Sequence, residues 1–590
     1  MRIVRPLAVL LFLCSGASGL MFETLWMRLL NPTFGATTLA ISTLLTVFMG
    51  GLALGGWLAG AIADRLRRES SVLMVYGLLE LVVAAYGIAF PAILGWVHEL
   101  HGWIWSSFSP GPAAFALLRF AVVGLVLIIP TTAMGATLPV LSRFYARSEV
   151  GLGREAGTLY SVNIFGAVSG TFLAGFVLMP SMGLGATNRL ACSINLLLCL
   201  AAAGLGCWLR RRETEWEATT VVPGRDAAPW NLSWTQKAAL VGVAVSGLVA
   251  MVYQQVWTRI LAQIVGSSVY AFAMILMAFL LGLAVGGAAY SRLMALRPGQ
   301  MARLGTIHLL VATMVLLGFI YVDRLPEIFL ALAQRSSVSP GSIFLLQFLM
   351  CSLVVFLPTL FMGMIFPATI AVCADGTSGV GRTVGRVYAI NTVGSIVGSF
   401  LGGFVMLPLL GSQTSLAVMI VGNLLLAVFF SGLAPLSRRA RLLRAGAMGM
   451  LLIATLVGVQ SRWEPRRMTS GVFRLALHMQ GGRDAGCPDA SSPIGRLFAS
   501  GPGAAHVKSA RALLGHRPQL WPRCPEIAGA ALLHYREGLV ATVSTWQTIV
   551  EGLEPTTCWE SLILQVNGKV DASATGAFRK PPEARCVEYV

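Results

Sequence analysis

The sequence predicts an all-α polytopic membrane protein with a 6+6 parallel duplication of helices and a small β-containing C-terminal tail. Three observations predict this class. The 590 residues are 56% hydrophobic and 12% charged, and the mean hydropathy is +0.75. Apolar runs long enough to cross a bilayer recur over most of the chain. The apolar part is also repeated at a nearly constant offset.

Thirteen apolar segments approach or exceed the length of about 20 residues that a helix needs to span a bilayer. They are predicted at 7–29, 36–63, 71–96, 113–142, 156–180, 188–209, 236–261, 268–293, 304–322, 343–373, 384–410, 414–433 and 441–459. The first also fits a cleavable signal, because Arg2 and Arg5 precede it. Its duplicate at 236–261 cannot be a signal, so both are interpreted as spans. The last is either a thirteenth span or a helix outside the membrane.

The duplication runs through two separate blocks. The stretch SGASGLMFETLWMRLL, from Ser15, returns as SGLVAMVYQQVWTRIL, from Ser246, at an offset of 231. A second block repeats at an offset of 228, and it includes Tyr160 with Tyr388 and Asn163 with Asn391. Nearly constant offsets across separated blocks indicate duplication of a whole module. Six spans are an even number, so both copies enter the membrane from the same side.

Parallel repeats of this kind form the two halves of major facilitator transporters, and one loop resembles theirs. After the second span the chain reads GAIADRLRR, which contains Gly60, Asp64 and Arg65. This resembles the Gly-Asp-Arg-Arg motif that major facilitators carry between their second and third helices. The second copy, GAAYSRLMALR, lacks the aspartate. The resemblance implies a transporter-like bundle whose polar pathway lies between the two halves.

The formal net charge of +18 is distributed as expected for a membrane protein rather than a nucleic-acid binder. Arginines cluster in alternate loops, whereas the loops around 31–35, 97–112, 181–187 and 262–267 contain almost no basic residues. This positive-inside pattern predicts a cytoplasmic N-terminus. The bilayer is therefore the expected partner, and we expect no nucleic-acid partner.

The ten cysteines form no CxxC or Cys/His spacing, so we expect no metal site. Six lie in apolar spans, and Cys487, Cys524, Cys558 and Cys586 lie in the tail. Disulfides among the tail cysteines are compatible with an oxidising compartment.

Glycines four residues apart predict close helix packing in both copies. Small residues at this spacing let helix backbones approach one another in lipid. The pairs are Gly51 with Gly55, Gly282 with Gly286, Gly166 with Gly170, and Gly394 with Gly398.

Polar residues inside the spans are the candidate substrate pathway, because an ionisable group in hydrocarbon costs several kcal/mol. Three positions differ in charge between the copies: Glu23 with Gln254, Glu80 with His308, and Arg119 with Gln347. Asn163 and Asn391 complete the set. Each residue is interpreted either as an interhelical bond or as part of a pathway in which Glu23 and Glu80 attract a cation.

The tail resembles a known enzyme family. The segment HYREGLVATVST (Tyr535, Glu537, Gly538, Thr542, Val543) is followed by LQVNGKVDAS (Asn567, Gly568, Lys569, Asp571, Ser573). These strand-like segments resemble the small N-terminal domain of spermidine synthases, the polyamine aminopropyltransferases. With SRWEPRRMTSGVF and the two membrane copies, the chain resembles the bacterial, membrane-bound, fused members of that family. The resemblance implies a bacterial inner-membrane location.

After Ser573 the chain departs from that family. Its members continue into a domain that binds decarboxylated S-adenosylmethionine and supplies the acidic catalytic residues. Here the sequence reads ATGAFRKPPEARCVEYV, which is too short for such a domain. We therefore assign no catalytic residue and expect no cofactor in this chain, which we interpret as truncated or frame-shifted.

The predicted organisation is a first membrane repeat at 7–210, a basic linker at 211–235 and a second membrane repeat at 236–434. The extra helix follows at 441–459, then an irregular linker at 460–530, the strand remnant at 531–575 and an unrelated tail at 576–590. The first functional hypothesis is a transporter-like or scaffolding protein, linked to a small cationic solute or polyamine and without aminopropyl transfer of its own. The alternative is an aminopropyltransferase that acts with a missing or separately encoded catalytic subunit. A purely structural membrane subunit is the third.

Overall fold

The computed structural model describes residues 4–34, 38–66, 68–108, 111–146, 151–211, 232–266, 269–335, 340–374, 379–461, 463, 527–537, 542–551, 557–566 and 569–579. Most of the predicted linkers at 211–235 and 460–530, and the end of the 576–590 tail, fall outside these residues. Gly538, Asn567 and Gly568 also lie outside them.

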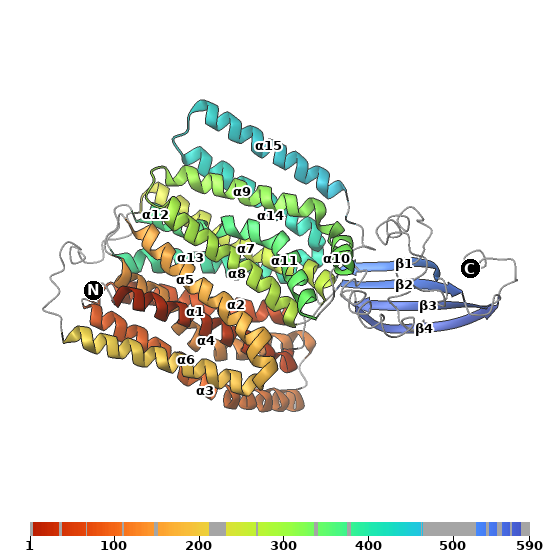
Figure 1. Cartoon of the computed structure of the whole chain (residues 1–590), viewed down its shortest axis with the longest axis horizontal. Coiled ribbons are helices and arrows are strands. Elements are labelled where there is room, and N and C mark those ends of the chain that lie inside the picture. The colour runs from red at the N-terminus through yellow and green to blue at the C-terminus, as the bar shows by residue number, and fades with distance from the viewer. Residues whose placement is uncertain are drawn as a thin grey trace.

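The membrane part consists of two six-helix halves packed side by side (Figure 1). The first half contains α1 (Val4–Phe34), α2 (Thr38–Ala63), α3 (Glu69–Phe108), α4 (Pro112–Tyr145), α5 (Leu152–Phe172), η1 (Leu173–Leu178) and α6 (Met179–Arg210). The second contains α7 (Trp234–Val265), α8 (Val269–Leu293), α9 (Gln300–Tyr321), η2 (Val322–Arg324), α10 (Leu325–Arg335), α11 (Pro340–Gly363), α12 (Ile365–Cys373), α13 (Val380–Phe400), η3 (Leu401–Met406) and α14 (Leu407–Leu433).

The duplication extends to the irregularities of the helices. The π-helical turns η1 and η3 occupy equivalent positions, 228 residues apart. Gly183 (φ 76°) and Gly411 (φ 73°), also 228 apart, break the helical path that follows each π turn. A residue with a side chain rarely adopts this positive φ, so glycine is suited to ending the fifth span of each half.

The third helix differs between the halves. In the first half α3 runs unbroken for 40 residues. In the second half the equivalent stretch is divided at the 3-10 turn η2, just before α10. Pro326 stands at the start of α10, and a proline both lacks an N–H donor and disfavours helix in the residue before it.

The described helices confirm a multi-pass membrane protein. Eleven segments are long and apolar enough to cross a membrane. Two of them, Leu152–Arg210 and Val380–Leu433, are 59 and 54 residues long, and each contains the positive-φ glycine that separates two spans. When these two are each counted as a pair, the described chain contains thirteen segments of sufficient length: six in each half and α15 (Arg438–Gln460). An odd number places the end of α15 opposite the start of α1, as Figure 1 shows.

The helix α15 lies outside the two halves and packs against the second one. Its Arg444 guanidinium donates to Thr306 Oγ1 at 2.7 Å and to the Ala302 carbonyl at 3.2 Å, both on α9. The indole N–H of Trp463, just beyond α15, donates to the Phe319 carbonyl at 3.1 Å. Polar bonds at both ends therefore attach this helix, and beyond its arginine-rich start its exposed side chains are mainly apolar, which suits lipid.

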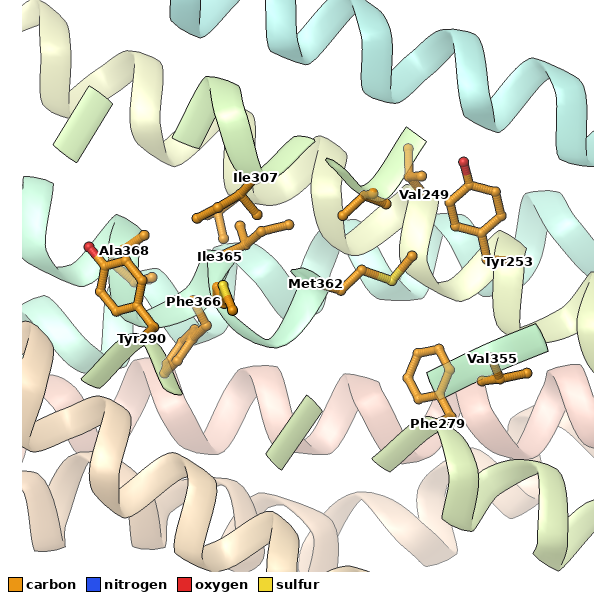
Figure 2. Close-up of a cluster of buried hydrophobic side chains, with 14 of the residues drawn as sticks. Val249, Tyr253, Phe279, Tyr290, Ile307, Val355, Met362, Ile365, Phe366 and Ala368 are labelled. Carbon is orange, nitrogen blue, oxygen red and sulfur yellow. The ribbon is translucent and has the colours of Figure 1, made fainter. Parts of the chain in front are cut away.

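The apolar core runs through both halves, and Figure 2 shows part of it in the second half. Tyr253 of α7, Phe279 of α8, Val355 and Met362 of α11, and Phe366 of α12 are buried there together. Close packing between these helices fixes the positions of the side chains that face the centre of the bundle.

Helix backbones approach most closely at glycines. A Cβ on Gly51 would lie 1.8 Å from Thr131 Oγ1, and one on Gly282 would lie 1.9 Å from Thr359 Oγ1. The same holds at Gly55, Gly286, Gly166, Gly170, Gly394 and Gly398, where an added Cβ would lie 1.8–2.2 Å from a backbone oxygen. No side chain fits these positions without displacing the neighbouring helix.

Four antiparallel strands form a sheet in the order β1-β2-β3-β4. They are β1 (Ile527–Glu537), β2 (Thr542–Glu551), β3 (Thr557–Val566) and β4 (Lys569–Arg579). The strands extend beyond the predicted bounds of 531–575 on both sides, since Gly576 still pairs with Glu560. In Figure 1 the sheet extends from the end of the bundle at which α10 lies.

Candidate functional site

A cavity of about 250 Å³ lies at the centre of the bundle, between the two halves. Its walls come from the first, second, fourth and fifth spans of each half. Pockets for small molecules are commonly about 300–1,000 Å³, so this volume suits a small solute.

The cavity lies on the pseudo-twofold axis of the duplication. Its thirty-two lining residues form sixteen pairs, each related by an offset of 231 or 228. The first-half members are Ser15, Gly16, Gly19, Leu20, Glu23, Leu45, Phe48, Met49, Leu52, Met134, Thr137, Leu138, Tyr160, Asn163, Ile164 and Ala167. A lining that pairs completely across the two halves shows that both contribute the same faces of the same helices.

Among the described residues that line the cavity, Glu23 is the one with a charged side chain. It lies on α1, and its counterpart on α7 is Gln254; each side chain is 5% exposed. Within the described part of the chain, no hydrogen-bond donor or cation contacts the Glu23 carboxyl group. A buried carboxyl that faces a cavity without a partner is suited to a cation or a proton.

Asn163 and Asn391 line the cavity from α5 and α13, at equivalent positions. The Asn163 amide donates to the Phe12 carbonyl of α1 at 3.2 Å, which leaves its own oxygen as an acceptor. The rings of Tyr160 and Phe366 lie 4.6 Å apart, and Tyr388 lies 6.2 Å from Phe366. Aromatic faces at such a position favour organic cations.

Glu80 lies behind the cavity wall rather than in it. The carboxyl group is 2% exposed on α3, and it accepts a hydrogen bond of 2.6 Å from the Ser15 hydroxyl of α1. Ser15 itself lines the cavity. A single hydroxyl group, that of Ser15, therefore separates the Glu80 carboxyl from the cavity that Glu23 faces.

His308, the counterpart of Glu80, is 0% exposed and is bonded differently. Its Nδ1 lies 3.0 Å from Asn423 Oδ1 of α14, and the Asn423 amide donates to the Tyr253 hydroxyl at 3.1 Å. His308 also stacks on Phe430, with ring centroids 5.5 Å apart. This group lies away from the cavity, and no described residue bonds its Nε2.

The structure does not bring the third predicted pair to the cavity. Arg119 lies half-buried on α4, outside the lining. Gln347 is buried on α11, where its amide donates to the Val265 carbonyl at 3.2 Å, at the end of α7. Of the eight polar candidates, Glu23, Gln254, Asn163 and Asn391 therefore share one cavity, and Glu80 is joined to it through Ser15.

Contacts between the halves close the bundle at the end where α1 begins. The Asp64 carboxylate, just past α2, accepts hydrogen bonds from the backbone N–H groups of Gly381 and Arg382, each at 2.8 Å, at the start of α13. Burial raises the pKa of Asp64, and these two bonds oppose the shift. At the equivalent junction, α5 and α8 are in close van der Waals contact, because a Cβ on Gly157 would lie 2.3 Å from Ser291 Oγ.

A different contact joins the halves farther along α1. The Arg28 guanidinium lies over the Tyr270 ring of α8, 5.5 Å from its centroid. Tyr270 in turn contacts Phe176 of η1, with centroids 5.7 Å apart. The cavity thus lies between two contacts that cross from one half to the other.

Four lining residues are not among the candidates predicted from the sequence: Ser15, Tyr160, Phe366 and Tyr388. A signal for three of them was present, because Ser15, Tyr160 and Tyr388 are unchanged across the duplication. In addition, Ser15, Gly19 and Glu23 are spaced four residues apart and share one face of α1.

Among the described residues, no group of three His, Cys, Asp or Glu side chains is placed to hold a metal ion.

No protein-family model matches the chain, and no curated protein matches it. Among solved structures it is similar to a variant of the E. coli fucose:proton symporter FucP (12% identity, TM-score 0.43) and to a bacterial homologue of the iron transporter ferroportin (13%, 0.44). It is also similar to the human organic anion transporter MFSD10 (15%, 0.39). These likenesses cover 73% of this chain and 98–99% of the others. Because the TM-scores are below 0.5, these likenesses carry no information on the substrate or the direction of transport.

Proposed function

We propose that this chain transports a small organic cation through the cavity between its halves, with Glu23 as the partner of the cationic group. The observation that carries the proposal is the Glu23 carboxyl: one charged group, 5% exposed, without a described partner, in a cavity of otherwise neutral side chains. An uncompensated charge in such surroundings is costly, and an ammonium group would offset that cost.

The neutral lining supports the same class of solute. The Asn163 and Asn391 amides and the Tyr160 and Tyr388 hydroxyls supply acceptors for N–H donors. The Tyr160, Phe366 and Tyr388 rings supply faces for a cation. In addition, the two halves are held together mainly by packed glycines and a few polar bonds, which is compatible with one half rocking against the other.

Uptake into proteoliposomes tests the proposal, with radiolabelled propylamine, putrescine and spermidine as probes. We expect Glu23→Gln to raise KM for the transported amine by at least about tenfold, because the buried partner of the ammonium is lost. The double variant Glu23→Gln/Gln254→Glu should recover much of the lost affinity, since position 254 presents the same cavity with an equivalent side chain. Uptake that is insensitive to Glu23→Gln would rule the proposal out.

A polyamine is our preferred substrate because of the family resemblance. Support for this comes from Tyr535, Glu537, Lys569 and Asp571, in segments similar to spermidine synthases, and from the antiparallel strands that contain them. A separately encoded catalytic subunit is part of the same proposal. Binding of decarboxylated S-adenosylmethionine by the purified chain, or by a complex pulled down with it, would favour the enzymatic alternative. A scaffold would form such complexes without amine flux.

The proposed location is a bacterial inner membrane with the N-terminus in the cytoplasm. The arginine distribution supports this orientation, and thirteen spans would then place the sheet outside. Labelling of Cys487 or Cys524 in intact cells with a membrane-impermeant maleimide tests the orientation, because only an outside tail would react.

A further inference from the structure

We infer that Glu80 is a proton-coupling site and that the Ser15 hydroxyl relays protons between it and the cavity. This inference rests on the proposed transport function and adds a second carboxyl with a separate role. The inference is based on geometry. Ser15 lines the cavity and donates a 2.6 Å hydrogen bond to the carboxyl group of Glu80, a residue outside the cavity lining.

The two carboxyl groups are suited to different tasks. Glu23 and Ser15 both face the cavity from α1, eight residues or about 12 Å apart along the helix. A solute reaches Glu23 directly, whereas the Glu80 carboxyl, 2% exposed and outside the lining, is joined to the cavity through the Ser15 hydroxyl. The length of the Ser15–Glu80 bond is typical of a hydroxyl that donates to a carboxylate.

A serine hydroxyl has one proton to donate and lone pairs to accept another. A hydronium ion in the cavity gives a proton to Ser15 Oγ and becomes water. Ser15 passes its original proton to Glu80 Oε1. O–H bonds therefore form on Ser15 Oγ and on Glu80 Oε1, and O–H bonds break on the hydronium ion and on Ser15. The serine ends unchanged, the carboxylate becomes a carboxylic acid, and the positive charge of the proton has left the cavity. The reverse sequence releases the proton.

The surroundings of Glu80 leave its charge uncompensated. The groups that face it are the Ser15 hydroxyl of α1, the Tyr76 hydroxyl of its own helix and the Cys199 thiol of α6. The neighbouring α4 contributes no titratable or charged group to it within the described chain. Protonation therefore changes the net charge of this buried cluster, and no basic residue holds Glu80 permanently ionised.

The second half argues against a purely structural role for the Ser15–Glu80 bond. At the equivalent position, His308 bonds Asn423 on α14, and no described bond joins it to Ser246, the counterpart of Ser15. The third span of the second half thus packs against its neighbours without a titratable group linked to the cavity. The link exists in one half, which also contains Glu23.

Transport separates the two carboxyl groups. In proteoliposomes we expect Glu80→Gln to retain putrescine counterflow, which needs no proton gradient, and to lose putrescine accumulation driven by a pH gradient. Glu23→Gln should weaken both. Gradient-driven accumulation by Glu80→Gln at the wild-type level would overturn the inference. Counterflow in Glu23→Gln tests the proposed substrate site, whereas gradient-driven accumulation in Glu80→Gln tests the proton-coupling site. The two proposals can therefore be contradicted independently.

Infrared difference spectroscopy tests the relay without a substrate. Spectra recorded between about pH 5 and pH 9 in the Glu23→Gln background should contain a carboxyl C=O band that disappears with Glu80→Gln. Ser15→Ala should shift this band and slow its exchange in D₂O by about tenfold or more, since one hydrogen bond is lost. Ser246→Ala, the matched change in the other half, should leave the band in place. Equal spectra for the two serine variants, or no Glu80-dependent band, would contradict the relay.

Discussion

Asp64 and Gly381 belong to different halves of the molecule, yet the Asp64 carboxylate accepts a hydrogen bond of 2.8 Å from the backbone N–H of Gly381. The Arg382 N–H donates to the same carboxylate at 2.8 Å. The first N–H groups of a helix have no partner within it, so Asp64 satisfies two of these donors at the start of α13. The aspartate of the GAIADRLRR loop thus joins the two halves.

Asp64→Ala is expected to expose these two N–H groups. Hydrogen bonds to a charged acceptor are worth about 1.5–3 kcal/mol, so amide exchange in a peptide covering the start of α13 should accelerate by roughly ten- to a hundredfold. Hydrogen-exchange mass spectrometry measures this directly. Asp323→Ala serves as the control, because Asp323 lies in η2, away from the junction. Equal protection of α13 in both variants would show that Asp64 does not hold the halves together.

Gly51→Ala is expected to destabilise the first half. The new Cβ would lie 1.8 Å from the buried Thr131 Oγ1, so α2 and α4 must separate. Overpacking of this kind costs about 1–3 kcal/mol. Gly50→Ala is the matched control, since a Cβ there has no atom within 4 Å outside its own helix turn. Unfolding in mixed micelles at increasing SDS measures both, and equal midpoints would contradict the packing argument.

The fold could be predicted from the sequence because its signals are repeated and local. Twenty-residue apolar runs specify helices in lipid, since each must satisfy its own backbone groups. The offsets of 231 and 228 specify two equivalent halves. The equivalence of the halves extends to backbone detail, because the positive-φ breaks at Gly183 and Gly411 recur at the offset of 228. The sequence leaves the choice between twelve and thirteen spans open, and α15 is long and apolar enough to be the thirteenth.

The site was less predictable because it depends on contacts between residues far apart in sequence. Hydropathy marks Glu23 and Glu80 as unusual but does not distinguish a residue in the cavity from one behind its wall. That distinction comes from the Ser15 hydroxyl, 65 positions from Glu80. Similarly, Arg119 and Gln347 are polar residues in apolar spans, and only the packing of α4 and α11 keeps them out of the lining. The roles proposed for these residues remain predictions.

Arg444→Ala is expected to loosen α15. The guanidinium donates to Thr306 Oγ1, Ala302 O and Ser431 Oγ at 2.7–3.2 Å, and few other polar bonds hold this helix. Loss of this set should speed exchange or proteolysis across 438–460 by about tenfold or more. Arg441→Ala, which removes an exposed arginine one turn earlier, is the control. Equal rates in the two variants would mean that lipid contacts alone retain α15.

Gln254→Glu is expected to change which amines the cavity prefers. The variant adds a second carboxylate, related to Glu23 by the pseudo-twofold axis and lining the same space. A monoamine can compensate one carboxylate, whereas putrescine has an ammonium group at each end and can compensate both. Two unpartnered carboxylates would repel, so the empty cavity should favour binding of a dication over a monocation by at least about tenfold.

The measurement is the ratio of kcat/KM for putrescine to that for propylamine, in wild type and in Gln254→Glu. A ratio within one protein cancels differences in folding and amount, which matters because a buried carboxylate also lowers stability. We expect the ratio to rise in Gln254→Glu and to fall again when Glu23→Gln is added, because one carboxylate then remains. An unchanged ratio in both would mean that the transported cation does not lie between positions 23 and 254.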